Sequence, residues 1–127
     1  QFGNLSNYLQ TADKQICLIV QLETKAGLKA LNDILDVDGI DGVFIGPADL
    51  AADMGYLGKP HEEEVQEAIL DAIQRISASS KAAGILSLDD QDTAIYLSAG
   101  ARFVSVASDV LTLNKALFAK AKKWRKN

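Results

Sequence analysis

Four short apolar runs alternate along this 127-residue chain with segments in which apolar residues recur at helical spacing. The runs are too short for buried helices and rich in β-branched residues, which is typical of strands buried on both faces of a parallel sheet. We predict these strands near residues 16–21, 42–45, 84–86 and 103–107. Strands that alternate with helices require an α/β architecture with parallel neighbours and right-handed crossovers.

The segments between the strands carry the signals of helix starts and stops. We expect helices over residues 25–35, 48–54, from 62 onward, about 90–97, and from 108 or 109 onward. Thr24 is placed to cap the first of these, and Leu31 lies on its apolar stripe. Three glutamates in the first turn mark the start of the helix after residue 62 as the clearest in the chain.

Four βα units are half of a (β/α)8 TIM barrel, and the chain has about half of the roughly 250 residues that such a barrel needs. The sequence contains no linker or low-complexity segment, so residues 1–127 are interpreted as one half-barrel in a single domain. The only methionine is Met54, and the missing initiator leads us to expect the C-terminal half of a longer protein. The alternative is an open doubly wound sheet, but residues 21–24 lack its glycine-rich phosphate loop.

The charge distribution limits the possible partners. The chain has 13 Lys+Arg against 17 Asp+Glu, and five of the basic residues lie in the last eight positions, where they suit a helix C-terminus. Nucleic-acid binding needs basic residues along one face, so we expect no nucleic-acid partner. No apolar run is long enough to span a bilayer and no signal peptide is evident, which predicts a cytoplasmic protein without a membrane partner. Cys17, inside the first apolar run, is interpreted as a buried, inert thiol.

Two carboxylates follow neighbouring predicted strands: Glu23 comes after the first strand, and Asp49 comes after the second. Reactive groups of parallel α/β folds lie at such strand ends, and strands about 4.8 Å apart allow the two side chains to meet. Two hard oxygen ligands suit Mg²⁺ or Mn²⁺. On spacing alone, however, the preferred interpretation is structural: Glu23 as a charge at a helix start and Asp49 as a cap. His61 is interpreted as a surface loop residue, and Asp89, Asp90 and Asp92 as residues that cap a helix.

Longer stretches of the chain resemble a known family. They are CLIVQLET at residues 17–24, ILDVDGIDGVFIGPADLAADMGY at 34–56, KAAGIL at 81–86 and GARFVSVASD at 100–109. Together they are similar to the HpcH/HpaI aldolase family, particularly the 4-hydroxy-2-oxoheptanedioate aldolases. The resemblance implies a (β/α)8 barrel that cleaves or forms a carbon–carbon bond beside pyruvate, with a divalent metal holding the pyruvate enolate.

The resemblance also assigns roles to individual residues. It places the two metal-binding carboxylates of the family on Glu23 and Asp49. Gln21 matches a glutamine that hydrogen-bonds the pyruvate oxygen or a metal-bound water. The backbone N–H groups of Ala48 and Asp49 would bind the pyruvate carboxylate at a helix start, and Leu86 would pack against its methyl group.

The family's His-centred acid/base segment and its substrate-binding arginine belong to the first half of the barrel. Neither His61 nor Arg102 matches those segments, so we expect no catalytic residue within this half. The resulting hypothesis is a metal-dependent carbon–carbon lyase that acts on a small 2-oxo acid and uses Mg²⁺ or Mn²⁺, with Co²⁺ as a further option. The chain alone is expected to be inactive.

Two alternatives stay open. The chain could be a non-catalytic half-barrel module that self-associates, because half a barrel has two unpaired sheet edges. Family members also assemble through C-terminal helices, which predicts a homo-oligomer, although Trp124 could equally cover the core of its own barrel. The second alternative is a citrate-lyase or malyl-CoA-lyase type of relative, which would share the metal carboxylates and use a larger acyl substrate.

Overall fold

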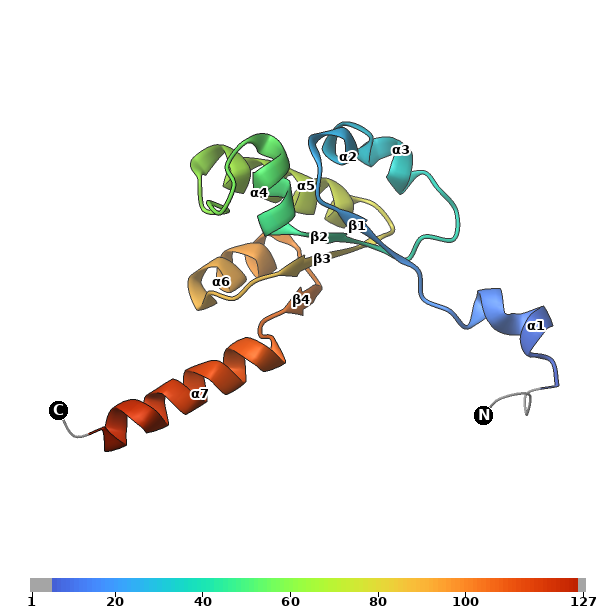
Figure 1. Ribbon diagram of the computed structural model, residues 1–127. Coiled ribbons are helices and arrows are strands. Elements are labelled where there is room, and N and C mark those ends of the chain that lie inside the picture. Colours follow the sequence, from blue (N-terminus) through green and yellow to red (C-terminus); the bar gives the residue numbers. More distant parts are fainter. Residues whose placement is uncertain (1–5, 126–127) are drawn as a thin grey trace.

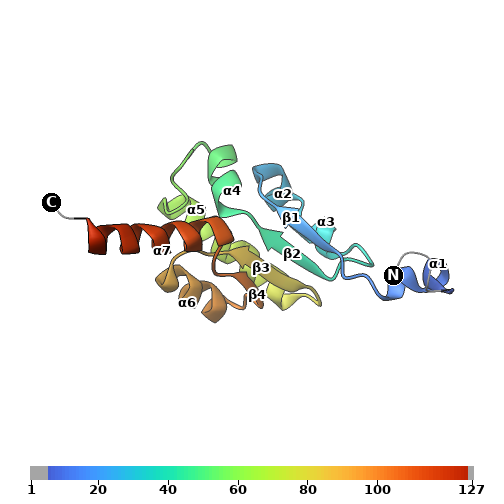
Figure 2. The same ribbon diagram turned by 60° about the horizontal axis from the view of Figure 1, so that its bottom comes forward.

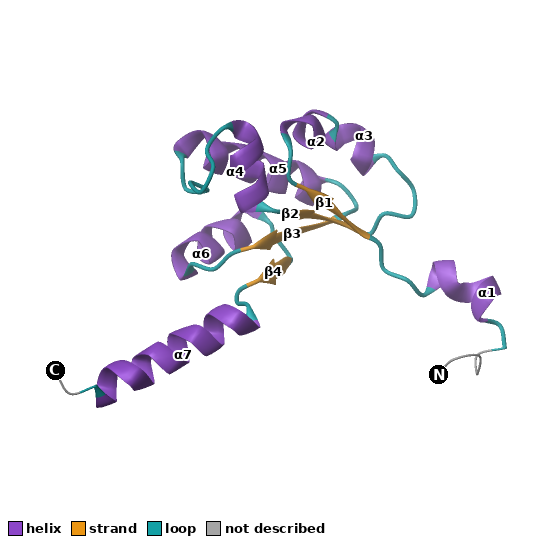
Figure 3. Cartoon of the chain, viewed as in Figure 1, coloured by secondary structure: helices purple, strands orange, loops and turns teal. Residues whose placement is uncertain are grey.

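The computed structural model describes residues 6–125, in which the apolar runs form one parallel sheet (Figures 1 and 3). Its strands are β1 (Ile19–Leu22), β2 (Gly42–Ile45), β3 (Ala82–Leu86) and β4 (Phe103–Ser105), and they lie side by side in sequence order. Ile19 pairs with Gly42, and Gly42 pairs with Ala82. The predicted α/β fold with four consecutive βα units is confirmed.

Helices lie between the strands and at both ends of the chain, and those between the strands cover one face of the sheet. They are α2 (Lys25–Lys29), α3 (Leu31–Leu35), α4 (Pro47–Met54), α5 (Glu63–Ala78), α6 (Asp90–Ala99) and α7 (Asp109–Trp124), preceded by α1 (Tyr8–Thr11) and a 3-10 turn, η1 (Ala12–Lys14). Figure 1 shows α2 to α5 gathered over one side of the sheet, whereas α1 and α7 project away from it.

The core lies between α5 and the sheet. The apolar stripe of α5 is fully buried and consists of Val65, Ile69, Ala72, Ile73 and Ile76. Val43, Ile45 and Ile85 point to the same side from β2 and β3, and they too are inaccessible to solvent. Leu31, on the predicted stripe of the first helical segment, is buried at 0% exposure. The packing therefore follows the helical and strand periodicities of the sequence.

The opposite face of the sheet is open, as the turned view in Figure 2 shows. Phe44 and Phe103 meet there in an edge-to-face contact with ring centroids 5.7 Å apart. They reach each other across β3 because Gly84 lies between them; a Cβ on Gly84 would come within 2.8 Å of the Phe44 ring. Ile19 and Leu86, on the same face, are 40% and 36% exposed. The prediction of strands buried on both faces is wrong for this chain, because helices cover one face only.

The first strand is shorter than predicted. Residues 16–18 precede β1, and Ile16 and Leu18 are about half exposed. Leu18 is held by Asp41, whose side chain accepts from the Leu18 N–H at 2.7 Å, but β2 begins only at Gly42. Cys17 therefore has neither a neighbouring strand nor a covering helix and is exposed, so its prediction as a buried thiol is wrong.

Other boundaries also differ. The predicted helix over residues 25–35 is two short helices, because the backbone at Ala30 departs from helical geometry. The fourth strand stops at Ser105 rather than at residue 107, and the third begins two residues early, at Ala82. Thr24 caps α2 as predicted, since its hydroxyl accepts from the Gly27 N–H at 3.0 Å. Ser108 likewise caps α7.

The last helix has no buried residue. Trp124 is 75% exposed, so it does not cover the core of its own chain. Lys122 and Lys123 lie in the last turn, as expected for partners of the helix dipole, whereas Lys126 lies outside the described residues. The first residues, Gln1 to Asn4, on which the prediction about a signal peptide partly depends, also lie outside them.

The length and hydropathy of the helices bear on membrane insertion. Over residues 6–125, every helix is too short or too polar to cross a bilayer. This agrees with the absence of a long apolar run in the sequence.

The Tyr56 hydroxyl, after α4, donates a hydrogen bond to the Glu64 carboxylate of α5 at 2.5 Å. This bond and the negative charge of Glu64 raise the pKa of Tyr56 above its ordinary 10.0. The contact therefore stabilises the fold fully below the ordinary pKa of Tyr56, and this stabilisation is lost as the pH rises through the raised pKa.

We expect Glu64→Gln to lower the pKa of Tyr56, measured by the ultraviolet absorbance of the ionised phenol. Tyr56→Phe identifies its signal among the three tyrosines, and an unchanged titration would contradict the prediction.

Candidate metal and substrate site

Gln21 and Glu23 project from the open face at the carboxyl end of β1. Strand alternation puts the two side chains on the same side, with Leu22 buried between them on the other. Both side chains lie against Gly46, which follows β2. A Cβ on Gly46 would come within 3.1 Å of Glu23 Oε2 and 3.2 Å of Gln21 Nε2. The absence of a side chain at residue 46 therefore leaves room for the amide and the carboxylate to meet at the end of β2.

Glu23 is not used to start the following helix. The first N–H groups of α2 are taken by other side chains: Asp53 accepts from Lys25 at 2.7 Å, and Thr24 accepts from Gly27. Glu23 itself has no hydrogen bond or ion pair with any residue between 6 and 125. Its carboxylate is half-buried and available to a ligand.

Asp49 lies in the first turn of α4, three residues after Gly46. The helix dipole stabilises a negative charge at this position. No side chain caps this helix, however, and the exposed Asp49 carboxylate accepts no hydrogen bond from a described residue. Pro47 at the first helical position has no N–H to satisfy. The next two N–H groups, of Ala48 and Asp49, are unpaired in the described chain. Free N–H groups at the start of a helix are typical of sites that hold carboxylates.

The chemistry of the two predicted ligands suits a hard cation. The two carboxylates, Glu23 and Asp49, have no lysine or arginine paired with them among residues 6–125, and their oxygens are the ligands that Mg²⁺ and Mn²⁺ prefer. No described group of three or more His, Cys, Asp or Glu side chains could hold a metal ion. A metal here would depend on two protein carboxylates, with its other positions filled by water or substrate.

A cavity of about 250 Å³ opens beside this helix start, at the carboxyl ends of β2 and β3. Ala48 lines it from α4, and Leu86 lines it from the end of β3. The structure thus brings together two groups of predicted residues: Gln21 and Glu23 meet at Gly46, while Ala48 and Leu86 face one cavity.

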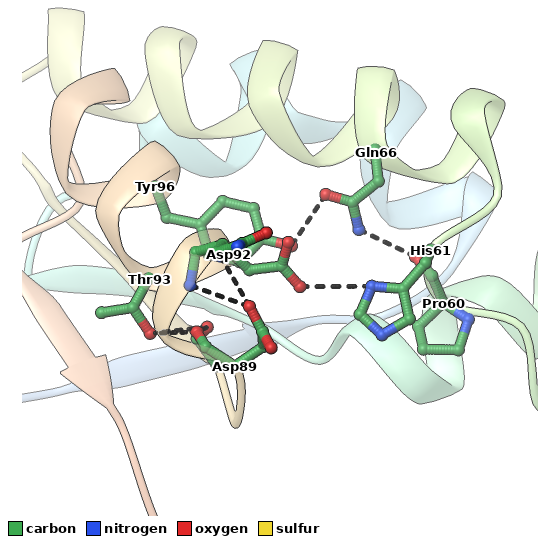
Figure 4. A network of polar contacts seen from close by, with 9 residues as sticks. Pro60, His61, Gln66, Asp89, Asp92, Thr93 and Tyr96 are labelled. Carbon is green, nitrogen blue, oxygen red and sulfur yellow. Dashed lines mark hydrogen bonds and ion pairs between the residues drawn. The ribbon is translucent and has the colours of Figure 1, made fainter.

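The far wall of the cavity is a polar network that the sequence did not reveal (Figure 4). His61 Nδ1 lies 3.2 Å from Asp92 Oδ2, so this carboxylate contacts the imidazole. The cap of α6 is formed by Asp89, one of the three predicted capping residues, whose side chain accepts from the N–H groups of Gln91 and Asp92. The prediction that Asp92 contributes to the cap through its side chain is therefore wrong.

A second contact closes the network behind the His61 ring. The Gln66 amide donates to the Pro60 carbonyl at 2.8 Å and accepts from the Tyr96 hydroxyl at 2.9 Å. Burial raises the pKa of Tyr96, and the Gln66 hydrogen bond opposes this in part, so the hydroxyl stays protonated and can donate. One signal was present in the sequence: Asp92 and Tyr96 are four residues apart and hence share a face of α6.

The chain is similar to known proteins in both sequence and structure. Residues 3–116 match the family described as HpcH/HpaI aldolase/citrate lyase. The chain is 54% identical over 124 residues to a hydroxypyruvate/pyruvate aldolase of Roseobacter denitrificans and 49% identical over 124 residues to a 4-hydroxy-2-oxo-heptane-1,7-dioate aldolase of Escherichia coli. These alignments cover 98% of the chain but 48% and 47% of the relatives.

A solved structure gives the same result. A HpcH/HpaI aldolase/citrate lyase family protein from Burkholderia cenocepacia superimposes with a TM-score of 0.91 at 34% identity, over 98% of this chain and 49% of that one. The chain therefore spans about half the length of the relatives it matches.

Proposed function

Because the chain belongs to the HpcH/HpaI aldolase/citrate lyase family, we propose that it supplies the metal-binding part of a class II pyruvate aldolase. Such an enzyme cleaves a 4-hydroxy-2-oxo acid to pyruvate and an aldehyde. The proposal includes the organisation of the enzyme: residues 1–127 form the C-terminal half of one (β/α)8 barrel. The open sheet face and the half-length alignments support this organisation.

The observation that carries the proposal is the convergence of Gln21 and Glu23 on Gly46, at the start of the helix that bears Asp49. In the proposal, Glu23 and Asp49 hold Mg²⁺ or Mn²⁺, or alternatively Co²⁺. A divalent cation there supplies Lewis-acid polarisation of the keto oxygen, which stabilises the negative charge that develops as the carbon–carbon bond breaks.

The remaining residues orient the 2-oxo acid. The N–H groups of Ala48 and Asp49 bind its carboxylate, and Gln21 donates to its keto oxygen or to a water. Leu86 packs against the methyl carbon of pyruvate, which is the carbon that bonds to the aldehyde. The proton of the substrate hydroxyl passes to a base that we place in water or in the other half of the barrel. This chain alone is therefore expected to bind metal weakly and to catalyse little or no cleavage.

Calorimetric titration of the chain with Mg²⁺ and with Mn²⁺, each with and without pyruvate, tests the proposal. We expect one weak, saturable site that binds more tightly in the presence of pyruvate, because the substrate fills open positions of the metal and neutralises the helix start. Titration with Ca²⁺ is the control and should give weaker binding, because Ca²⁺ is larger and prefers more protein oxygen ligands, whereas Mg²⁺ is commonly bound through one or two carboxylates and keeps its waters. Heats that do not saturate for either metal would contradict the proposal.

A citrate-lyase or malyl-CoA-lyase type of activity is the second enzymatic candidate, since the matching family includes citrate lyase. The names of the two relatives at about half identity favour the aldolase.

We also propose that the chain self-associates, as the alternative role of an assembly module requires. Apolar side chains are exposed along α7, including Val110, Leu113, Leu117 and Phe118, and the outer edges of β1 and β4 have no partner strand among the described residues. Water-exposed apolar faces and open edges favour association.

We expect sedimentation velocity at several concentrations to show an oligomer that dissociates on dilution. Leu117→Glu should weaken it and Lys120→Glu should not; a monomer at every concentration would refute the prediction.

A further inference from the structure

The cavity beside α4 has a lining that the pyruvate site does not use. We propose that it is a subsite for the substrate chain beyond the pyruvate unit, that it takes a short, uncharged chain bearing a hydroxyl group, and that His61 recognises that hydroxyl. This inference rests on the proposed aldolase function.

Continuity with the pyruvate site is the first argument. Leu86, which packs against the methyl carbon of pyruvate in the proposal, also lines the cavity. That carbon bonds to C4 of a 4-hydroxy-2-oxo acid, which carries the hydroxyl group that loses its proton in the reaction. The hydroxyl group assigned to His61 lies further along the chain, beyond C4. A chain that extends past Leu86 therefore enters the cavity. Its volume of about 250 Å³ lies below the roughly 300–1,000 Å³ of sites for drug-sized ligands, so it suits a short chain.

The imidazole of His61 is the group available for hydrogen bonding. Its Nδ1 contacts Asp92, which fixes the ring and leaves Nε2 free of described partners (Figure 4). In the neutral ring Nε2 accepts a hydrogen bond, and in the charged ring it donates one; a hydroxyl group can satisfy either. Gln66 and Tyr96 bond to each other, and Gln66 also holds Pro60, which anchors the loop that carries His61.

The charges of the lining define what the subsite excludes. Among the described residues, the lining includes the acidic Asp89 and Asp92 but no lysine or arginine. A second carboxylate on the substrate would face these like charges, and the positive charge of a protonated His61 is already paired with Asp92. The cavity should therefore discriminate against a chain that ends in a carboxylate and favour a neutral hydroxylated chain of similar size.

Nuclear magnetic resonance of the 127-residue chain tests this directly, because His61 is its only histidine and gives a single imidazole signal. The probes are glyceraldehyde and glycerate, which share a carbon skeleton and differ in the charge at one end. Without metal, and with excess pyruvate in every sample to occupy the Ala48 and Asp49 N–H groups, we expect glyceraldehyde to move the His61 and Leu86 signals to saturation and glycerate to bind at least about tenfold more weakly.

Two variants locate the effect. His61→Gln, followed through the Leu86 methyl signals, should weaken glyceraldehyde binding severalfold, whereas Lys59→Ala, on the same loop but outside the lining, should leave it unchanged. His61 is largely exposed, so the thermal midpoints of both variants should match the wild type. Glycerate binding as tightly as glyceraldehyde, or His61→Gln binding normally, would overturn the proposal.

The outcome separates this inference from the aldolase proposal. If metal binds at Glu23 but glyceraldehyde does not move the His61 signal, the subsite is wrong and the aldolase proposal stands. If glyceraldehyde binds but no metal site exists, the cavity binds a ligand but is not an aldolase subsite, and the inference falls with the function.

Discussion

Glu23→Gln should abolish saturable metal binding while leaving the fold intact. The substitution removes one of two carboxylates that would hold the cation and keeps nearly the same shape, and no described residue depends on that carboxylate for a hydrogen bond. Even partners one shell away from a metal contribute about 10- to 100-fold to affinity, so the loss of a direct ligand should be at least that large. Calorimetric titration with Mn²⁺ measures it, and circular dichroism monitors the fold.

Two companion variants sharpen this experiment. Glu64→Gln removes a carboxylate on α5, far along the chain, and should leave metal affinity unchanged. Gly46→Ala keeps both carboxylates but places a Cβ 3.1 Å from Glu23 Oε2, so it should weaken binding by displacing that oxygen. The backbone φ of −100° at residue 46 is ordinary for alanine, so the effect should come from the close contacts with Glu23 and Gln21 and not from backbone strain. If Glu23→Gln binds metal as the wild type does, Glu23 is only a residue before a helix and the aldolase mechanism is wrong.

Leu31→Ala should have the opposite profile: a large loss of stability and no specific effect on metal binding. Leu31 is completely buried where α3 packs on the core, and truncation of such a side chain leaves a cavity that costs roughly 2–5 kcal/mol. Domains of this size have a free energy of unfolding of about 5–15 kcal/mol, so the variant should unfold at a much lower urea concentration. Equilibrium unfolding in urea, followed by circular dichroism, provides the measurement.

Val37→Ala is the matched control for this loss. Val37 follows α3 and is 49% exposed, so its truncation should change the free energy of unfolding by less than about 0.5 kcal/mol. A similar cost for the two substitutions would show that the apolar stripe containing Leu31 does not form the core.

The order and type of the major elements could be predicted because each strand and helix has its own local pattern. What the pattern could not show is which neighbours are present. Residues 16–18 have the composition of a buried strand, but β2 starts only opposite Ile19, so these residues lie exposed before the sheet. The same reason accounts for the open face of the sheet: an apolar run indicates strand faces that can be buried, and no residue between 6 and 125 covers this one.

The candidate site shows a similar limit. Their positions at strand ends identified Glu23 and Asp49 as candidate ligands, but spacing alone favoured a structural role for both. The sequence could not show that Glu23 is not needed at the start of α2, because the residue that accepts from the Lys25 N–H there is Asp53, 28 positions away. The contact between Gln66 and Tyr96 spans 30 positions and the His61–Asp92 contact is comparably distant, so both depend on how α5 and α6 pack. Long-range pairs of this kind become visible only in the folded chain.

The sequential order of the strands has a consequence for how the chain unfolds. Each strand pairs only with the strands before and after it in sequence, as repeats do in a solenoid, so the stability of each unit depends on its immediate neighbours. The unit formed by β4 and α7 is at the end of this series, with a strand of three residues and a helix without buried side chains. It should fray first, and backbone amide exchange should proceed inward from that end towards the protected centre at β2, β3 and α5.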